Sequence, residues 1–160
     1  IGYQKEFNYG ALKLADLSSM AAEMRAQQSQ AMVRRVPLVR FDDVFDHDRL
    51  KLMKIDVEGM EIDVLRGAQK SIERFRPVLY VENEFADLSA ALVGALFDLG
   101  YDAWWHMASC FNPANFRGRK DNIFGSAGCL NMLCVPKENA ATINGMVKLQ
   151  SVDEHPRRAA

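Results

Sequence analysis

The spacing of hydrophobic and polar residues predicts several strands in the part of the chain after residue 35. Residues 50–57 are apolar on both faces apart from two lysines and an aspartate, as expected of a central strand in a parallel sheet. An apolar run of the same kind follows Pro77, which cannot continue a helix. The predicted strands cover residues 36–41, 50–57, 78–81, 101–107 and 129–135.

Two segments between these strands have the hydrophobic spacing of amphipathic helices. In residues 59–75 the apolar side chains recur every three or four positions, at Ile62, Leu65, Ala68, Ile72 and Phe75. A second helix is expected to begin near Asp87, which can cap it, and to end at Gly100. Its apolar stripe consists of Leu88, Leu92, Leu96 and Leu99.

The order of these elements predicts an α/β domain. Strands and helices alternate up to residue 107, as in folds that are built on a parallel sheet. A loop that contains Gly, Asn and Pro covers residues 108–127 and separates the last two strands, with no helix between them. We therefore expect those two strands to be antiparallel neighbours.

Length and composition fit a single domain. The chain has 160 residues, of which 49% are hydrophobic and 26% are charged, so it can bury one core but not two well-formed ones. We assign residues 1–150 to the domain and residues 151–160 to a polar tail. The net charge of -1 gives no overall field that favours nucleic acid, and no apolar run is long enough to span a membrane. We expect a cytoplasmic protein with no nucleic-acid or membrane partner.

The cysteines argue against a disulfide framework and against a zinc site. Cys110, Cys129 and Cys134 are an odd number, and none of them is part of a CxxC pair. We expect all three thiols to be reduced and most of them to be buried.

Carboxylates follow two of the predicted strands. The two-residue period of a strand places Lys54, Asp56 and, if the strand continues so far, Glu58 on one side. Gly59 comes next and allows an unusual backbone angle. The following strand ends at Glu82. Because ligands of open parallel sheets bind outside the carboxyl ends of the strands, we expect these acids to line a pocket.

Two other interpretations of the acids remain open from the residues alone. Acids at the start of a helix commonly satisfy free backbone N–H groups and do no chemistry, and Asp56, Glu58 and Glu61 fit that role. Several carboxylates together also suit a divalent cation, which prefers oxygen ligands. Glu84, two residues beyond Glu82, is expected to be a solvated loop acid.

The same residues carry a resemblance to a known family. The segment KIDVEGMEIDVLRGA at residues 54–68, followed by RPVLYVE at residues 76–82, resembles the signature of the FkbM family of S-adenosylmethionine-dependent methyltransferases. Residues 8–10 and 36–43 resemble the part that precedes this signature. The C-terminal part of many members is similar to residues 111–118, 122–125 and 131–136.

This resemblance implies a Rossmann-like methyltransferase fold, an α/β fold whose final strand pair is antiparallel. It also implies S-adenosylmethionine as cofactor and methyl transfer to a hydroxyl of a sugar, polyketide or related small metabolite. Such a transfer requires alignment of donor and hydroxyl, exclusion of water and a group that accepts the hydroxyl proton. On this resemblance Asp56 positions the donor or acceptor near the methyl group. Glu58 orients the acceptor hydroxyl or acts as the base, and Glu82 supports it.

Three further residues are candidates for binding the acceptor. His106 lies beside a predicted strand end, and histidine titrates near neutral pH, which suits a general base. Its tryptophan and methionine neighbours favour instead a packed, structural histidine. Asn112 and Asn115 in the long loop can hydrogen-bond to polyol oxygens, but asparagine is also a common turn former.

The donor-binding part of the family pattern is not found in the sequence. No Gly-rich loop after a first strand precedes residue 36, and a strand-helix-strand unit takes about 30 residues. The chain also begins with Ile1 rather than Met. We therefore expect it to be the C-terminal portion of the fold, with an exposed sheet edge through which it self-associates. The alternative is a non-enzymatic remnant or interaction module that keeps the signature without binding a donor.

Overall fold

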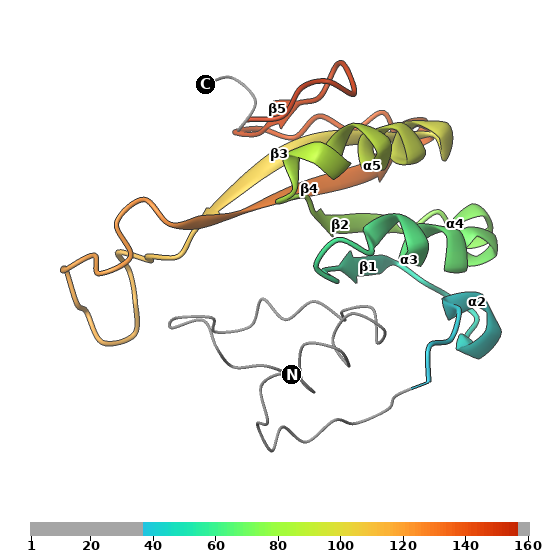
Figure 1. Ribbon diagram of the computed structural model, residues 1–160, viewed down its shortest axis with the longest axis horizontal. Helices are drawn as coiled ribbons and strands as arrows, with labels where there is room; N and C mark the ends of the chain where they lie inside the picture. Colours follow the sequence, from blue (N-terminus) through green and yellow to red (C-terminus); the bar gives the residue numbers. More distant parts are fainter. Residues whose placement is uncertain (1–36, 157–160) are drawn as a thin grey trace, which may run out of the picture.

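The computed structural model describes residues 37–156, which form a five-stranded sheet with helices packed against it (Figure 1). The strands are β1 (Leu52–Ile55), β2 (Val78–Glu82), β3 (Tyr101–Ser109), β4 (Gly128–Pro136) and β5 (Val147–Lys148). The helices are α2 (Phe41–Val44), α3 (Glu61–Gly67), α4 (Gln69–Phe75), α5 (Ala86–Asp98) and the 3-10 helix η1 (Lys137–Asn139). None of these described helices is long and apolar enough to cross a membrane. The predicted strand at residues 36–41 is wrong, because residues 37–40 lie outside any regular element and α2 begins at Phe41.

The sheet combines parallel and antiparallel pairing in the order β1-β2-β4-β3-β5. β1 and β2 are parallel, with Ile55 opposite Val81. β4 is antiparallel to both of its neighbours, β2 and β3. Its pairing with β3 extends over the full length of both strands, so the predicted antiparallel final pair is confirmed. β5, which the hydrophobic pattern did not predict, adds to the other side of β3.

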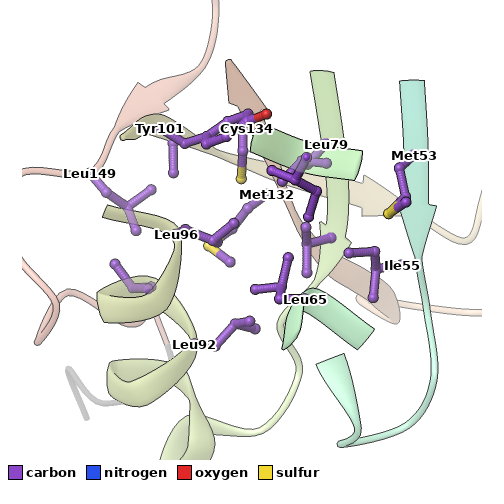
Figure 2. Packing of buried hydrophobic residues seen from close by; sticks show 14 of the residues in the cluster. Met53, Ile55, Leu65, Leu79, Leu92, Leu96, Tyr101, Met132, Cys134 and Leu149 are labelled. Atoms are coloured by element: carbon purple, nitrogen blue, oxygen red, sulfur yellow. The ribbon is translucent and has the colours of Figure 1, made fainter. Parts of the chain in front are cut away.

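One face of the sheet carries the hydrophobic core. Alternate side chains of the strands point to this face, as the two-residue period requires, and α3, α4 and α5 pack on it. Figure 2 shows Leu65 of α3 and Leu96 of α5 directed toward the strands that carry Leu79 and Met132. Burial of this apolar surface is the main favourable term in folding, so the sheet and its three helices are stabilised as one unit.

The predicted helix at residues 59–75 is two short helices rather than one. α3 ends at Gly67 and α4 begins at Gln69, with Ala68 between them at φ -113°. Gly67 is buried against the chain that precedes α2, where an added Cβ would lie 3.5 Å from the Arg40 Cα. The break leaves the first N–H groups of α4 available to an acceptor from elsewhere in the chain.

Asp42 of α2 supplies that acceptor. Its carboxylate accepts hydrogen bonds from the backbone N–H of Lys70 (2.9 Å) and from both the backbone N–H (2.9 Å) and the hydroxyl (2.6 Å) of Ser71. Burial acts to raise the pKa of Asp42, but these hydrogen bonds outweigh burial and the pKa is lowered. The contact joins α2 to the start of α4. The neighbouring Asp43 pairs instead with Arg40 on the surface, at 2.8 Å.

Arg76 fixes the amino end of β2. It follows α4 with φ 48° and donates hydrogen bonds to the carbonyls of Leu99 (2.8 Å) and Gly100 (3.1 Å). The guanidinium also forms a bidentate ion pair with Glu138, at 2.6 and 3.0 Å, and lies 4.7 Å from the centre of the Tyr101 ring. These contacts connect α4, the end of α5, β3 and η1 at this end of the sheet.

The last described residues pack against the sheet. His155, within the segment assigned to a polar tail, is only 4% exposed. Its Nε2 lies 3.2 Å from the Asn83 carbonyl oxygen, and its ring is 5.5 Å from that of Trp105. A polar sequence therefore hides a buried anchor, while the division at residue 150 stays a prediction.

Predictions for individual side chains have mixed outcomes. Gly100 ends α5 with a positive φ of 78°, as predicted. Asp87 lies in the first turn of α5 rather than at its N-cap, because the helix begins one residue earlier. The expectation that most thiols are buried is wrong: Cys134 is buried, but Cys110 and Cys129 are exposed.

Within the described residues, β1 lies at one edge of the sheet and pairs with β2 alone. An edge strand offers unpaired backbone groups to another chain, which is the basis of the expected self-association. That association stays a prediction.

Asp42→Ala should lower the free energy of unfolding by about 1 kcal/mol, because the first N–H groups of α4 lose their acceptor. The loss should shrink as the pH falls through the lowered pKa of Asp42, since protonation removes the same acceptor charge from the wild type. Urea unfolding followed by circular dichroism measures the change.

Asp43→Ala is the matched control for this prediction. The carboxylate of Asp43 pairs only with Arg40 on the surface among the contacts described, so its loss should have little effect. Equal destabilisation by the two variants would contradict the capping role of Asp42.

Candidate functional site

The carboxyl ends of β1 and β2 place acidic side chains at one edge of the sheet. Asp56 directly follows β1, and Glu82 is the last residue of β2. Because Ile55 lies opposite Val81 in a parallel pair, Asp56 and Glu82 come next at the same edge. The core-facing side chains of β1 alternate with exposed ones, so Lys54 and Asp56 lie on the predicted side.

A tight turn brings Glu58 back to this edge. The strand ends at Ile55, so Glu58 is not part of it. Glu58 has φ 55° and Gly59 has φ 102°, and glycine is the residue that adopts such angles at least cost. Glu61, buried in the first turn of α3, accepts a hydrogen bond from the Gly59 N–H at 3.0 Å. Glu61 therefore has the capping role that was one interpretation of these acids, and it fixes the turn that presents Glu58.

The three acids predicted to act in catalysis meet at this edge. One carboxylate oxygen from each of Asp56, Glu58 and Glu82 lies within 4.8 Å of the others. Asp56 is exposed, whereas Glu58 and Glu82 are half-buried. The spacing suits a divalent cation, the cationic group of an organic ligand, or a hydroxyl that donates to a carboxylate. We call these three residues the acidic cluster; their catalytic roles stay predictions.

Glu82 has the most altered acid–base behaviour in the acidic cluster. Burial raises its pKa, and the negative charges of Asp56, Glu58, Glu84 and Glu61 raise it further, to about 7. Its Oε2 atom is buried and has no hydrogen-bond partner among the residues that the structure describes. A carboxyl group that titrates near neutral pH can take up and release a proton at an ordinary working pH, as a general base must.

Lys54 balances part of this negative charge. Its Nζ lies 2.5 Å from the Oδ2 of Asp56, and the hydrogen bond raises the pKa of Lys54. Both side chains are substantially exposed, so the pair contributes little to stability. Its effect is to orient the Asp56 carboxylate.

Glu84 is fixed in place, and the expectation of a solvated loop acid is wrong. Its Oε1 accepts a hydrogen bond from the Leu130 N–H of β4. The contact joins the segment after β2 to the neighbouring strand and holds a negative charge near Glu82. Glu84 thereby helps to raise the pKa of Glu82.

His106 on β3 contacts a tyrosine that the sequence analysis did not single out. Its Nδ1 lies 2.6 Å from the hydroxyl oxygen of Tyr80, and burial raises the pKa of that tyrosine. Tyr80 lies on β2 two residues before Glu82, on the same face of the strand and opposite Lys54. The two-residue period that located Lys54 and Asp56 could have located Tyr80 as well.

Asn112 and Asn115 use their side chains to shape the loop that they belong to. The Oδ1 of Asn112 accepts from the Ala114 N–H at 2.9 Å. The amide of Asn115 bonds to the backbone of Asn112 (2.9 Å) and Arg119 (2.7 and 3.1 Å). The loop extends away from the sheet at the far end of β3 and β4 (Figure 1). Both residues therefore act as turn formers, while contact with an acceptor stays a prediction.

Glu82→Gln should stabilise the protein more at about pH 8 than at about pH 5. The pKa of Glu82 is raised in the folded protein from 4.5 to about 7, so between these values the folded state binds more protons than the unfolded chain. The wild type therefore loses stability as the pH rises through this range, and a neutral glutamine escapes that loss. Calorimetric melting temperatures across the range measure the difference.

Glu73→Gln, on the exposed side of α4, is the control for this experiment. Its effect on the melting temperature should change little with pH. An effect of Glu82→Gln as flat as that of the control would show that Glu82 titrates as an ordinary surface acid.

Comparison with known protein families covers the part of the chain that builds the acidic cluster. A model described as the methyltransferase FkbM domain matches residues 4–103, which is more than half of the chain. The match includes both β1 and β2; the further resemblance at residues 111–136 lies outside it. No curated protein and no solved structure matches the chain. The extent of the family match leads to one assignment: this chain belongs to the FkbM methyltransferase domain family.

Proposed function

We propose that this protein transfers a methyl group from S-adenosylmethionine to a hydroxyl of a small metabolite such as a sugar or polyketide. Membership of the FkbM family supports methyl transfer. The observation that carries the location of the site is the acidic cluster, which lies at the carboxyl ends of two parallel strands, where open α/β sheets bind ligands. An α/β sheet with an antiparallel final pair is consistent with a Rossmann-like methyltransferase fold.

The chemistry of the acidic cluster fits a cationic donor. When bound, S-adenosylmethionine supplies a sulfonium-activated methyl group for in-line displacement. Several carboxylates at one edge attract such a positive charge. We place Asp56 closest to the transferred methyl group, because it directly follows β1 and its carboxylate is oriented by Lys54 at 2.5 Å.

Glu82 is the proposed general base. The acceptor hydroxyl must lose its proton as its oxygen attacks, and a carboxylate with a pKa of about 7 can accept that proton near neutral pH. The buried Oε2 of Glu82 has no other hydrogen-bond partner within the described part of the chain. Glu58 then orients the hydroxyl, because the turn at Gly59 brings its carboxylate within 4.8 Å of the other two.

His106, Asn112 and Asn115 are the proposed contacts to the rest of the acceptor. The hydrogen bond from His106 to Tyr80 holds the imidazole on the face of the sheet that also carries Glu82. The asparagines lie in the loop between β3 and β4, which is the next segment along that hairpin. An acceptor with several hydroxyls would suit these polar groups.

A divalent cation is a second candidate ligand of the acidic cluster, because three carboxylate oxygens within 4.8 Å of one another can share a hard cation. Titration with Mg²⁺ tests this alternative through the melting temperature. A rise that Asp56→Asn abolishes would support cation binding. An unchanged melting temperature would favour the organic donor.

Asp56→Ala should lower methyl transfer by at least ~100-fold and leave the fold intact, because the carboxylate next to the reacting methyl group is removed while no buried contact is lost. The measurement is transfer of labelled methyl from S-adenosylmethionine to a panel of polyhydroxylated acceptors by the full-length protein. Asp63→Ala removes an exposed acid of α3 that pairs with Arg66, and it is the control.

Wild-type turnover by Asp56→Ala would contradict the proposed site. Circular dichroism and melting temperatures establish that both variants are folded. If the full-length protein fails to bind S-adenosylhomocysteine in a calorimetric titration, the non-enzymatic interaction module is the better account.

A further inference from the structure

Two exposed thiols lie side by side at the loop end of the β3–β4 hairpin. Ala108 of β3 is paired with Cys129 of β4. Cys110 directly follows β3, and its N–H donates to the Ala127 carbonyl at 3.0 Å. Cys110 and Cys129 are therefore diagonal neighbours on one face of the hairpin, and their thiols hydrogen-bond to each other.

These two thiols differ from the third cysteine in access. Cys134 is buried in the core, and burial raises its pKa strongly, so it is a poor nucleophile. Cys110 and Cys129 are both exposed. Of the three cysteines in the chain, this pair alone combines exposure with a printed thiol–thiol contact.

The backbone at this point favours a bond between the two strands. A Cβ added to Gly128 would lie 2.8 Å from the Ala108 carbonyl oxygen, so the strands approach closely beside Cys129. Diagonal Cα atoms in a hairpin are about 7–8 Å apart, somewhat more than the roughly 4.4–6.8 Å that a disulfide spans. Cys110 lies just beyond Ser109, the last residue of β3, so a small backbone shift can close that gap.

We propose that Cys110 and Cys129 form an intrachain disulfide when hydrogen peroxide oxidises the protein. The thiolate of one cysteine attacks the peroxide; an S–O bond forms, the O–O bond breaks, and a sulfenic acid and one water result. The second thiolate attacks the sulfenic sulfur, so that an S–S bond forms and the S–O bond breaks with release of a second water. Two thiols are oxidised, one peroxide is reduced, and the two thiol protons end in water.

Nearby acids influence how readily this reaction occurs. Burial, Cys110 and the negative charges of Glu84 and Glu82 raise the pKa of Cys129. Because the thiolate is the attacking species, the disulfide should form faster at alkaline pH.

The bond would close residues 111–128 into a ring at the base of the loop that extends from the sheet (Figure 1). Leu130, the next residue but for one neighbour bond from Cys129, donates its N–H to Glu84, so the disulfide would lie close to the acidic cluster. Any effect on acceptor binding through Asn112 and Asn115 rests on the proposed function. The disulfide itself does not.

The test treats the full-length protein with hydrogen peroxide and counts free thiols in denaturant. For the three cysteines described, the count should fall from three to one, and dithiothreitol should restore it. Mass spectrometry of unreduced peptides should identify the link between Cys110 and Cys129. Cys134→Ala is the matched control, because it should keep the disulfide, whereas Cys110→Ser and Cys129→Ser should each abolish it.

Three results would overturn the proposal: a disulfide that contains Cys134, a dimer linked between chains as the main product, or separate oxidation of Cys110 and Cys129 without a link. Circular dichroism of the untreated serine variants distinguishes loss of the disulfide from loss of the fold. Methyl transfer does not enter these measurements, so failure here and failure of the proposed function are separate results.

Discussion

The parallel pairing of β1 with β2 is the constraint on which the proposed site depends. Since Ile55 lies opposite Val81, the next residues at the end of each strand, Asp56 and Glu82, must share one edge of the sheet. Like charges at such a distance repel each other, and the half-buried Glu82 is also separated from water. The sheet tolerates this cost because its other face is covered by α3, α4 and α5 over a continuous core.

The two ends of β2 show how differently one strand can treat its charges. At the amino end, Arg76 is bonded to two carbonyls, to Glu138 and to the face of Tyr101. At the carboxyl end, Glu82 keeps an oxygen without a hydrogen-bond partner among the described residues. A fold that satisfies its polar groups at one end and leaves an acid unsatisfied at the other locates its chemistry at the second end.

Local pattern was sufficient to predict the strands and the acids that follow them. The apolar runs before Asp56 and Glu82 are visible in the sequence, and the strand period placed Lys54 and Asp56 on the correct side. Contacts between distant segments could not be predicted in this way. The split between α3 and α4 accompanies a hydrogen-bonding partner, Asp42, that lies 28 residues before Lys70. The raised pKa of Glu82 likewise depends on charges from α3, β1 and the segment after β2, which only the fold brings together.

The most direct measurement is a carbon-13 NMR titration of the Glu82 side-chain carboxyl, assigned by its loss in Glu82→Gln. A midpoint near pH 7 is the predicted result, because burial and the surrounding carboxylates hold the proton on Glu82. A midpoint near the ordinary value of 4.5 would contradict the account. The acidic cluster would then be a solvated sheet edge, without a group suited to take a proton from an acceptor hydroxyl.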